Sequence, residues 1–317
     1  MWPGIGLGHT SLPTSARNGS KVTLFIQQCI NGVALGSSYA MFAMGFGLVF
    51  ATMGILNVAH GTYATWGAII ALFAFTNLSL PMLGAIAVGV VGAGLIGVMV
   101  DQIGFEPLRR RGGGLLGPII TSIGFWIILG QLALIATDAR IKTFPRSALP
   151  RGFVKTGGLV IPYHQIITFF TAIALLAVMY LFVNRTRAGA EMRAVGWDPK
   201  SSALSGVNPR RVVIVTSFLA AGMAAVAGIL SAISTNNVSF TLGEGLLLKG
   251  FAAVIVGGFG DLRGAYVGGL IIGLAEILGA QYISNSFRDF FTFGLLILIL
   301  VVRPQGLLGN RIVTLRA

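Results

Sequence analysis

Long apolar stretches run along almost the whole chain and constrain its fold more than any other feature. Four of them are Val22–Met53, Met82–Ile103, Gln165–Val183 and Val212–Ser234. A helix rises 1.5 Å per residue, so about 20 apolar residues cross the hydrocarbon core of a bilayer, and each stretch approaches or exceeds that length. Charged residues make up 10% of the chain, against about 25% in soluble domains. The sequence therefore predicts an all-α polytopic membrane protein.

Two further apolar stretches are short or interrupted. Thr62–Phe75 follows a turn that contains Asn57 and His60, and Leu246–Gly260 is too short for an easy crossing. Non-helical backbone at membrane depth is tolerated only where protein or a water-filled cavity covers it. We therefore expect about eight transmembrane helices together with short or re-entrant broken segments.

The chain is expected to form one membrane domain with a tail at each end, because no polar region is long enough to fold alone. The three regions are a disordered N-terminal tail at 1–21, a transmembrane domain at 22–309 and a C-terminal tail at 310–317. Lys and Arg gather in cytoplasmic loops of membrane proteins. This rule places 185–209 and the C-terminal tail in the cytoplasm, and it leaves the basic loop 137–164 outside, where longer loops partly escape the rule.

The longest polar run between two apolar stretches is Arg185–Pro209. Apolar residues at helical spacing predict a first short helix, and Asp198 followed by Pro199 is a capping pair for a second. Asn208 followed by Pro209 repeats this start for the next apolar stretch. Most charged loops between spans are solvated connections. A folded and basic loop instead favours a docking surface for a soluble cytoplasmic partner.

The chain carries no recognisable catalytic, metal or nucleotide motif. Its net charge of +13 does not indicate nucleic-acid binding, because the basic residues cluster at the ends of apolar stretches. A phosphate-binding loop G-x-x-x-x-G-K-[ST] and the motifs G-x-S-x-G and H-E-x-x-H are absent. The single cysteine and three dispersed histidines offer no metal-ligand spacing. We therefore expect a non-catalytic chain that binds no metal or cofactor itself.

Glu276 is the chief ionisable residue inside a predicted span, about twelve residues from its start. A carboxylate at that depth is costly and is a functional candidate by default. The alternative is a protonated or hydrogen-bonded carboxyl that ties helices together. Because the sequence shows no partner for it, we prefer the second interpretation.

A solute path is expected at the broken segments, where polar residues and glycines interrupt apolar runs. The candidates are Asn31, Ser37, Ser38, Tyr39, Asn57, His60, Gly61, Gly250, Gly257, Gly258 and Gly260. Helix capping by Asn57 and His60, and close packing at the glycines, are the structural alternatives.

Several stretches together carry a resemblance to a known family. They are Asn31–Gly61, Arg193–Asn208, Ala220–Leu230 and Gly250–Glu276, followed by the tail Arg303–Gly309. In this order and spacing, the chain resembles the LivH-type permease subunit of branched-chain amino acid ABC importers. The resemblance runs from about Phe25 to Gly309 and leaves the N-terminal tail uncovered.

The resemblance implies a subunit of a bacterial inner-membrane importer. Its partners would be a second, LivM-like permease, two cytoplasmic ATPases that bind ATP and Mg²⁺, and an extracytoplasmic substrate-binding protein, with lipid around the spans. The resemblance places 185–209 where such permeases seat on the ATPase. The residues that fall on the family's pattern there are Glu191, Arg193, Ala194, Gly196, Asp198, Ser205 and Gly206.

The expected substrate is a branched-chain amino acid, namely leucine, isoleucine or valine, or a related small polar solute. Similar permeases serve urea, short amides and aromatic acids, so these remain alternatives within the family. A self-sufficient channel or an ion-coupled secondary transporter is the alternative from another class. It would need a deep network of ionisable groups, for which Glu276 is the strongest mid-span candidate.

Overall fold

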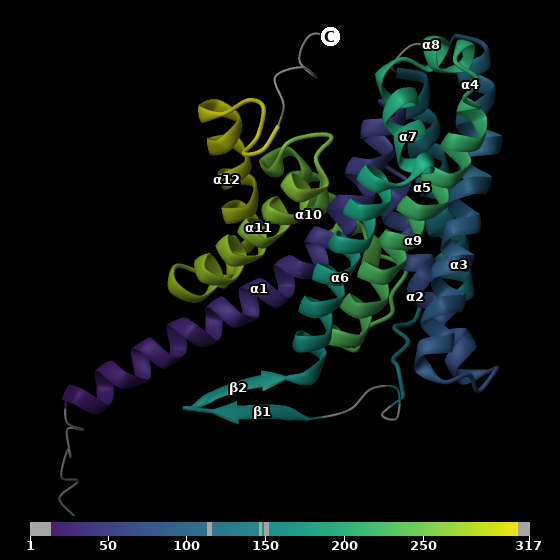
Figure 1. Ribbon diagram of the computed structural model, residues 1–317. Helices are drawn as coiled ribbons and strands as arrows, with labels where there is room; N and C mark the ends of the chain where they lie inside the picture. Colours follow the sequence, from purple (N-terminus) through teal and green to yellow (C-terminus); the bar gives the residue numbers. More distant parts are fainter. Residues whose placement is uncertain (1–13, 113–115, 146–147, 149–151, 310–317) are drawn as a thin grey trace, which may run out of the picture.

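A computed structural model describes residues 14–112, 116–145, 148 and 152–309 of the 317-residue chain (Figure 1). The described part is a helical bundle with one two-stranded hairpin, which confirms the predicted all-α membrane class. The elements in chain order are α1 (Thr14–Met53), α2 (His60–Thr76), α3 (Met82–Val100), a π-helical turn (Asp101–Phe105), α4 (Glu106–Arg110), α5 (Leu116–Ala136), β1 (Phe153–Thr156), β2 (Leu159–Pro162), α6 (Tyr163–Arg185), α7 (Arg187–Trp197), α8 (Pro199–Leu204), α9 (Pro209–Thr235), α10 (Leu242–Gly257), α11 (Leu262–Tyr282), a 3-10 turn (Asn285–Phe287) and α12 (Arg288–Val302).

Within the described residues, seven helices are long and apolar enough to cross a membrane. They are α1 from Lys21, α3 with its extension to Arg110, α5, α6, α9, α11, and α12 with the preceding 3-10 turn. The two short helices, α2 with 17 residues and α10 with 16, lie at the two places where the sequence predicts broken segments. The two broken segments therefore lie where the sequence predicts them, and the seven candidate spans are one fewer than the roughly eight expected.

The bundle has two polar ends. The α7–α8 end carries α4, α7, α8 and residues 303–309, and the hairpin end carries β1, β2 and the loop that precedes them (Figure 1). β1 and β2 pair antiparallel, with Phe153 opposite Pro162. A bridge between Lys142 and Val238 fastens the loop before the hairpin to the segment between α9 and α10. The hairpin lies inside the loop 137–164, for which the sequence indicated no regular structure.

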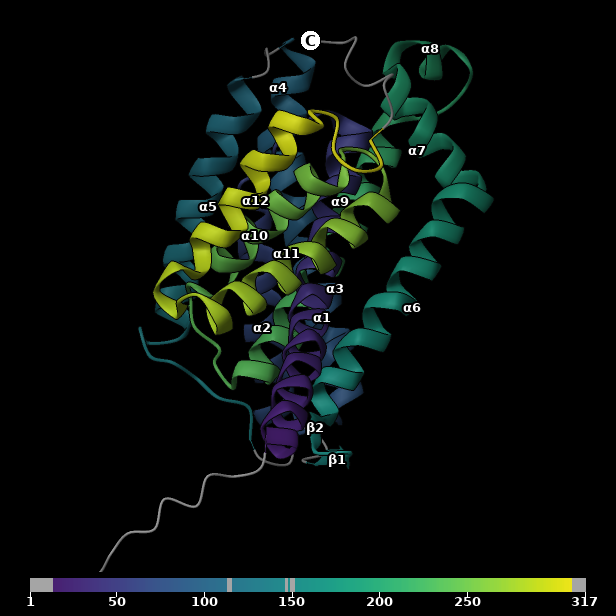
Figure 2. The ribbon, with the colours of Figure 1, turned by 90° about the vertical axis from the view of Figure 1, so that its left-hand side faces the viewer.

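The core lies where α1, α2, α9, α10 and α11 meet. α1 packs along both α9 and α11, and α2 packs between α3 and α9. α9 is rich in small buried residues such as Ala220 and Ala224, which let helices approach closely in lipid. Figure 2 shows α5 and α6 at opposite sides of this core. Exposed apolar side chains on α3, α5, α6 and α12 give the bundle a surface suited to hydrocarbon.

α1 begins at Thr14, inside the stretch expected to be a tail. Residues 1–13 and 310–317 lie outside the described residues. The division of the chain into a tail, a membrane domain and a second tail therefore stays a prediction.

Candidate functional site

The polar loop 185–209 folds into two helices, as predicted. Thr186 caps α7, since its hydroxyl accepts the Gly189 N–H at 3.1 Å. Asp198 caps α8 by accepting the Lys200 N–H at 3.0 Å, with Pro199 at the first helical position. Asn208 caps α9 in the same way at 3.2 Å. Both capping pairs predicted from the sequence are confirmed.

The inner face of this loop is anchored to the bundle. Met192 and Val195 on α7 are buried against Val212 of α9. Gly196 lies directly against the backbone carbonyl of Ala51 near the end of α1, where a side chain would collide. Arg193 donates a hydrogen bond to the carbonyl of Val183, in the last turn of α6. Helix α7 is therefore anchored to α1, α6 and α9.

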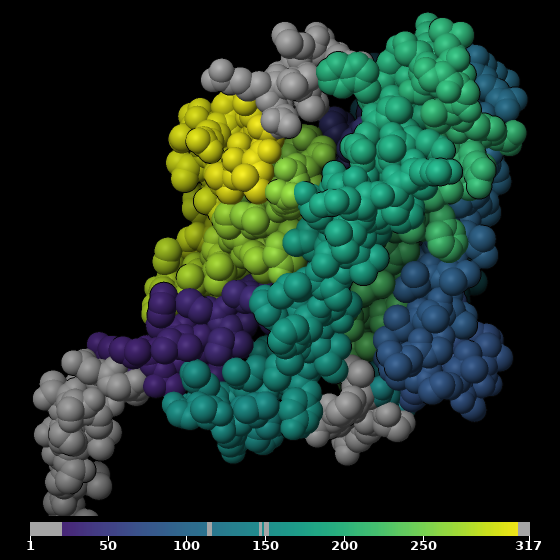
Figure 3. All heavy atoms as spheres, in the orientation of Figure 1, coloured from purple at the N-terminus to yellow at the C-terminus, as the bar shows by residue number. Residues whose placement is uncertain are grey.

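The outer face of the loop carries apolar side chains at a polar end of the molecule. Leu204 at the end of α8 is 91% exposed, and Trp197 at the end of α7 is 62% exposed. Figure 3 shows α7 and α8 projecting at this end. Among the residues that match the family's pattern, Ser205 and Gly206 are also exposed, while Glu191, Ala194, Gly196 and Asp198 are partly covered.

An ion network stiffens the same end of the bundle. Arg109 donates to both carboxylate oxygens of buried Asp101, at 2.7 and 3.1 Å, and to Glu106 at 2.9 Å. Arg210, one residue after the start of α9, donates to the side-chain oxygen of Gln102 at 2.9 Å. The network joins the end of α3 to the start of α9, beside the α7–α8 loop.

Both short helices begin inside the bundle. After α1 ends at Met53, the chain turns back, and His60 at the start of α2 contacts the rings of Phe42 and Phe46 on α1. These rings lie 7 to 11 residues before the end of α1, or roughly 10–17 Å at 1.5 Å per residue. Helix α10 also starts within the bundle, because Gly243 in its first turn lies against the backbone of Gly61 at the start of α2.

The first turns of α2 and α10 cross at two glycines. A side chain at Gly243 would collide with the carbonyl of Gly61. The Gly243 N–H donates to the hydroxyl of Thr65 on α2 at 3.0 Å. The indole N–H of Trp66, the next residue on α2, donates to the Leu129 carbonyl of α5 at 3.0 Å. Three helices thus meet at one place.

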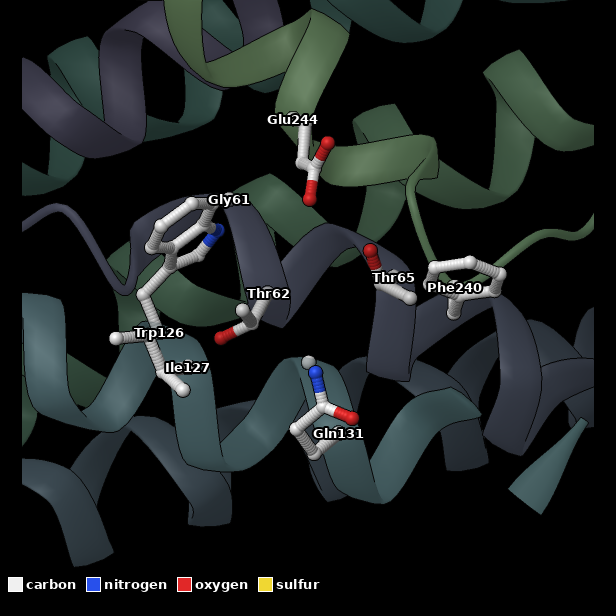
Figure 4. Close-up of a pocket in the computed structure, with 9 residues that line it drawn as sticks. Gly61, Thr62, Thr65, Trp126, Ile127, Gln131, Phe240 and Glu244 are labelled. Atoms are coloured by element: carbon white, nitrogen blue, oxygen red, sulfur yellow. The ribbon is translucent and has the colours of Figure 1, made fainter. Parts of the chain in front are cut away.

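A cavity of about 120 Å³ lies between these three helices. Its lining residues are Gly61, Thr62, Thr65, Trp126, Ile127, Gly130, Gln131, Phe240 and Glu244. In Figure 4, the Glu244 carboxylate and the Gln131 amide face each other across the cavity, with Thr62 and Thr65 beside them. The site therefore combines one acidic group, several neutral polar groups and aromatic walls.

The predicted path residues do not gather around one cavity, and Gly61 alone among them lines this one. Asn31 accepts from Gln165 at 3.1 Å near the hairpin end. Ser37 donates to the Val33 carbonyl, Asn57 donates to the Tyr63 hydroxyl, and Ser38 is buried. Gly250, Gly257 and Gly258 lie against other chain segments, and Gly260 is open. His60 is fully buried among aromatic rings.

Glu276 is fully buried on α11 and has partners on three other helices. Tyr39 of α1 donates to its carboxylate at 2.9 Å, and the Lys249 ammonium of α10 lies 2.6 Å from it. Arg288 at the start of α12 forms a further ion pair with it, and Lys249 also lies 3.3 Å from Asp289. Glu276 is six residues from the end of α11, roughly 9 Å, and so is nearer the hairpin end than the sequence suggested.

Sequence reasoning missed Glu244, Lys249 and Arg288. The sequence did contain a signal for Glu244. It is a carboxylate three residues after Thr241, at the start of an apolar run. The partners of Glu276 come from residues 27 positions before it and 12 after it, and no local pattern connects them.

The chain matches known proteins over most of its length. A family described as "Branched-chain amino acid transport system / permease component" matches residues 28–300. The high-affinity branched-chain amino acid permease protein BraD of Pseudomonas aeruginosa is 35% identical over 90% of this chain and 96% of its own length. LivH of Escherichia coli is 33% identical over 90% of this chain and 96% of its own length. A solved structure, PsaBC from Streptococcus pneumoniae in complex with Fab, has a similar fold, with a TM-score of 0.50 at 14% identity over 92% of this chain and 96% of that one.

Proposed function

The chain belongs to the permease-component family of branched-chain amino acid transport systems, and from this premise we propose that it forms the path for leucine, isoleucine and valine in an ABC importer. Its partners are a second permease, two ATPases that bind ATP and Mg²⁺, and a substrate-binding protein. The chain itself contributes the path and the coupling surface, and hydrolysis takes place in the ATPases. The protein crosses the inner membrane several times.

The observation that carries this proposal is the apolar outer face of the α7–α8 loop. Leu204 is almost fully exposed at an end of the bundle where charged residues are common. An exposed apolar side chain on a rigid, anchored helix pair suits a protein partner, because apolar anchors that fill pockets dominate binding energy at interfaces. We assign the α7–α8 end to the cytoplasm and the ATPase to this surface. The hairpin end then faces the substrate-binding protein.

The packing supports a route from the ATPase to the path. α7 contacts α1, α6 and α9, so a displacement of the α7–α8 loop moves the end of α1. The segment 54–59 follows directly and leads into α2, whose first turn crosses α10 at the cavity. The ATPases can drive transport only if they bind the two conformations of the permease with different affinity. We infer that closure of the ATPases shifts α1 and α2 against α10.

Purification and reconstitution test this proposal. The tagged chain, extracted from native membranes in mild detergent, should recover a second permease and two ATPases. The recovered complex, placed in liposomes with its binding protein, should take up leucine only when ATP is supplied on the ATPase side.

A different result of the same experiment would favour a secondary transporter over an ABC importer subunit. The cluster around Glu276 supplies ionisable groups of the kind that a secondary transporter needs. A chain that is recovered alone, and that moves leucine in liposomes without ATP, would establish that alternative class.

A further inference from the structure

We propose that the cavity between α2, α5 and α10 is a binding site for the head group of an amino acid, with the Glu244 carboxylate as counter-ion of the α-ammonium group. The inference rests on the proposed function, because it assumes that the chain lines a path for amino acids. Gly61 is the one lining residue of this cavity that the sequence also predicts for that path.

The first argument is the position of Glu244. It lies in the first turn of α10, which begins inside the bundle against the first turn of α2. Within the part of the chain that the structure describes, no hydrogen bond or ion pair reaches its carboxylate, and the residue is exposed. An unpaired carboxylate at membrane depth is costly in lipid, so such groups face a water-filled cavity or a partner group. Glu244 therefore faces the transport path or another subunit.

A purely structural role for Glu244 is less satisfactory. Thr241, followed three residues later by Glu244, has the spacing of a capping box, in which both side chains bond to the helix end. Thr241 makes no capping hydrogen bond here, and its hydroxyl lies 3.3 Å from that of Ser239 instead. The Glu244 carboxylate is directed into the cavity, toward the side of Thr62 and Thr65 (Figure 4). Attraction to the helix dipole alone is weak at exposed positions.

The second argument is the chemistry of the other walls. The Thr65 hydroxyl accepts the Gly243 N–H, which leaves its own proton for an acceptor in the cavity. The amide of Gln131 faces the same space and can also donate. Trp126, Ile127 and Phe240 supply apolar surface next to these groups. An acid for an ammonium group, donors for a carboxylate and apolar walls for a side chain fit a zwitterionic amino acid with an apolar side chain.

The size of the cavity agrees with a partial site. The cavity of about 120 Å³ has room for several water molecules. Glu244, Ile127 and Gln131 are exposed, so the cavity opens at the surface of this chain. The second permease then covers the opening and encloses the rest of the substrate.

The first arm of the test measures leucine uptake by the reconstituted importer. Glu244→Gln keeps the shape of the side chain and removes its charge. Loss of one charged hydrogen bond should raise the KM for uptake by about tenfold or more. Glu244→Asp should retain most of the activity. Gly245→Ala is the matched neighbouring control, because it changes the next residue and leaves the carboxylate in place.

The second arm tests the cavity without substrate. Cys29 is the sole cysteine, so Cys29→Ser provides a clean background for Ile127→Cys on the cavity wall. The assembled importer is labelled with cationic aminoethyl methanethiosulfonate and with neutral methyl methanethiosulfonate. Adding Glu244→Gln should lower the rate ratio of cationic to neutral reagent by about tenfold, as expected for one nearby charge. Leucine should slow labelling by both reagents.

The outcomes separate the site from the proposed function. An unchanged KM in Glu244→Gln together with an unchanged labelling ratio would overturn the site. Loss of the second permease from Glu244→Gln preparations would also overturn it, since Glu244 would then pair with that subunit. Failure of the unmodified importer to take up leucine would contradict the proposed function. In that case the effect of Glu244→Gln on the labelling ratio would still show whether the cavity attracts cations.

Discussion

The Lys249 ammonium on α10 lies 2.6 Å from the Glu276 carboxylate on α11, and both side chains are largely buried. Arg288 of α12 and the Tyr39 hydroxyl of α1 complete the surroundings of this carboxylate. Four helices, α1 near the start of the chain and the consecutive α10, α11 and α12 near its end, are therefore joined through one carboxylate. Charged groups at this depth persist only when they are paired, so the cluster determines how α10, α11 and α12 pack.

Removing the carboxylate should destabilise the bundle strongly. Glu276→Ala leaves Lys249 and Arg288 close together without their buried counter-ion. Breaking a buried pair by removing one partner costs about 3–5 kcal/mol. Denaturation of the purified protein in detergent should show this loss. Asp289→Asn is the control, because its side chain is 72% exposed and exposed pairs contribute at most about 1 kcal/mol. Similar small effects from both variants would contradict the role of the cluster.

The crossing of α2 and α10 should not tolerate a methyl group. Gly243→Ala places a side chain against the Gly61 carbonyl, and such overpacking costs about 1–3 kcal/mol. We expect lower thermal stability and loss of leucine uptake. Gly245→Ala, two residues further along the same helix, meets no atom within 4 Å and should be neutral or stabilising. Equal behaviour of the two variants would show that the crossing is not tight in the membrane.

The exposed apolar anchor at the end of α8 should be needed for coupling. Leu204→Asp places a charge where the proposed ATPase interface would be dry, so transport and ATPase stimulation should fall together. Its unfolding temperature should not change, because the side chain is 91% exposed. Leu204→Met should restore coupling. If an importer with Leu204→Asp keeps its normal subunits and its normal ATP-driven uptake, the ATPase must dock on another surface.

The guanidinium of Arg109 should not be replaceable by an ammonium group. Lysine cannot reproduce the two-point contact with Asp101, and it would also weaken the contact with Glu106. We expect Arg109→Lys to lose about 1.5–3 kcal/mol of stability, the contribution of a charged hydrogen bond. Arg111→Lys is the matched control at an exposed neighbouring position. Chemical denaturation of both variants in detergent measures the difference.

Features set by neighbouring residues could be predicted from the sequence. The long spans follow from composition, and the capping roles of Asp198 and Asn208 follow from residues two or three positions away. The partners of Glu276 could not be predicted, because they depend on how α10, α11 and α12 pack. Glu244 was not predicted as a site residue for a related reason. The start of α10 is determined by its crossing with α2 at Gly61, which the sequence of α10 does not contain.

The shortness of α10 has a consequence for how the protein is made. With 16 residues and the charges of Glu244 and Lys249, α10 is a poor substrate for insertion by the translocon, where each charged residue near a helix centre costs about 2.5–3.5 kcal/mol. Lys249 finds its counter-ion only after residues 262–289 have left the ribosome. We therefore expect α10 to settle in the bilayer only after α11 and the start of α12 have been made.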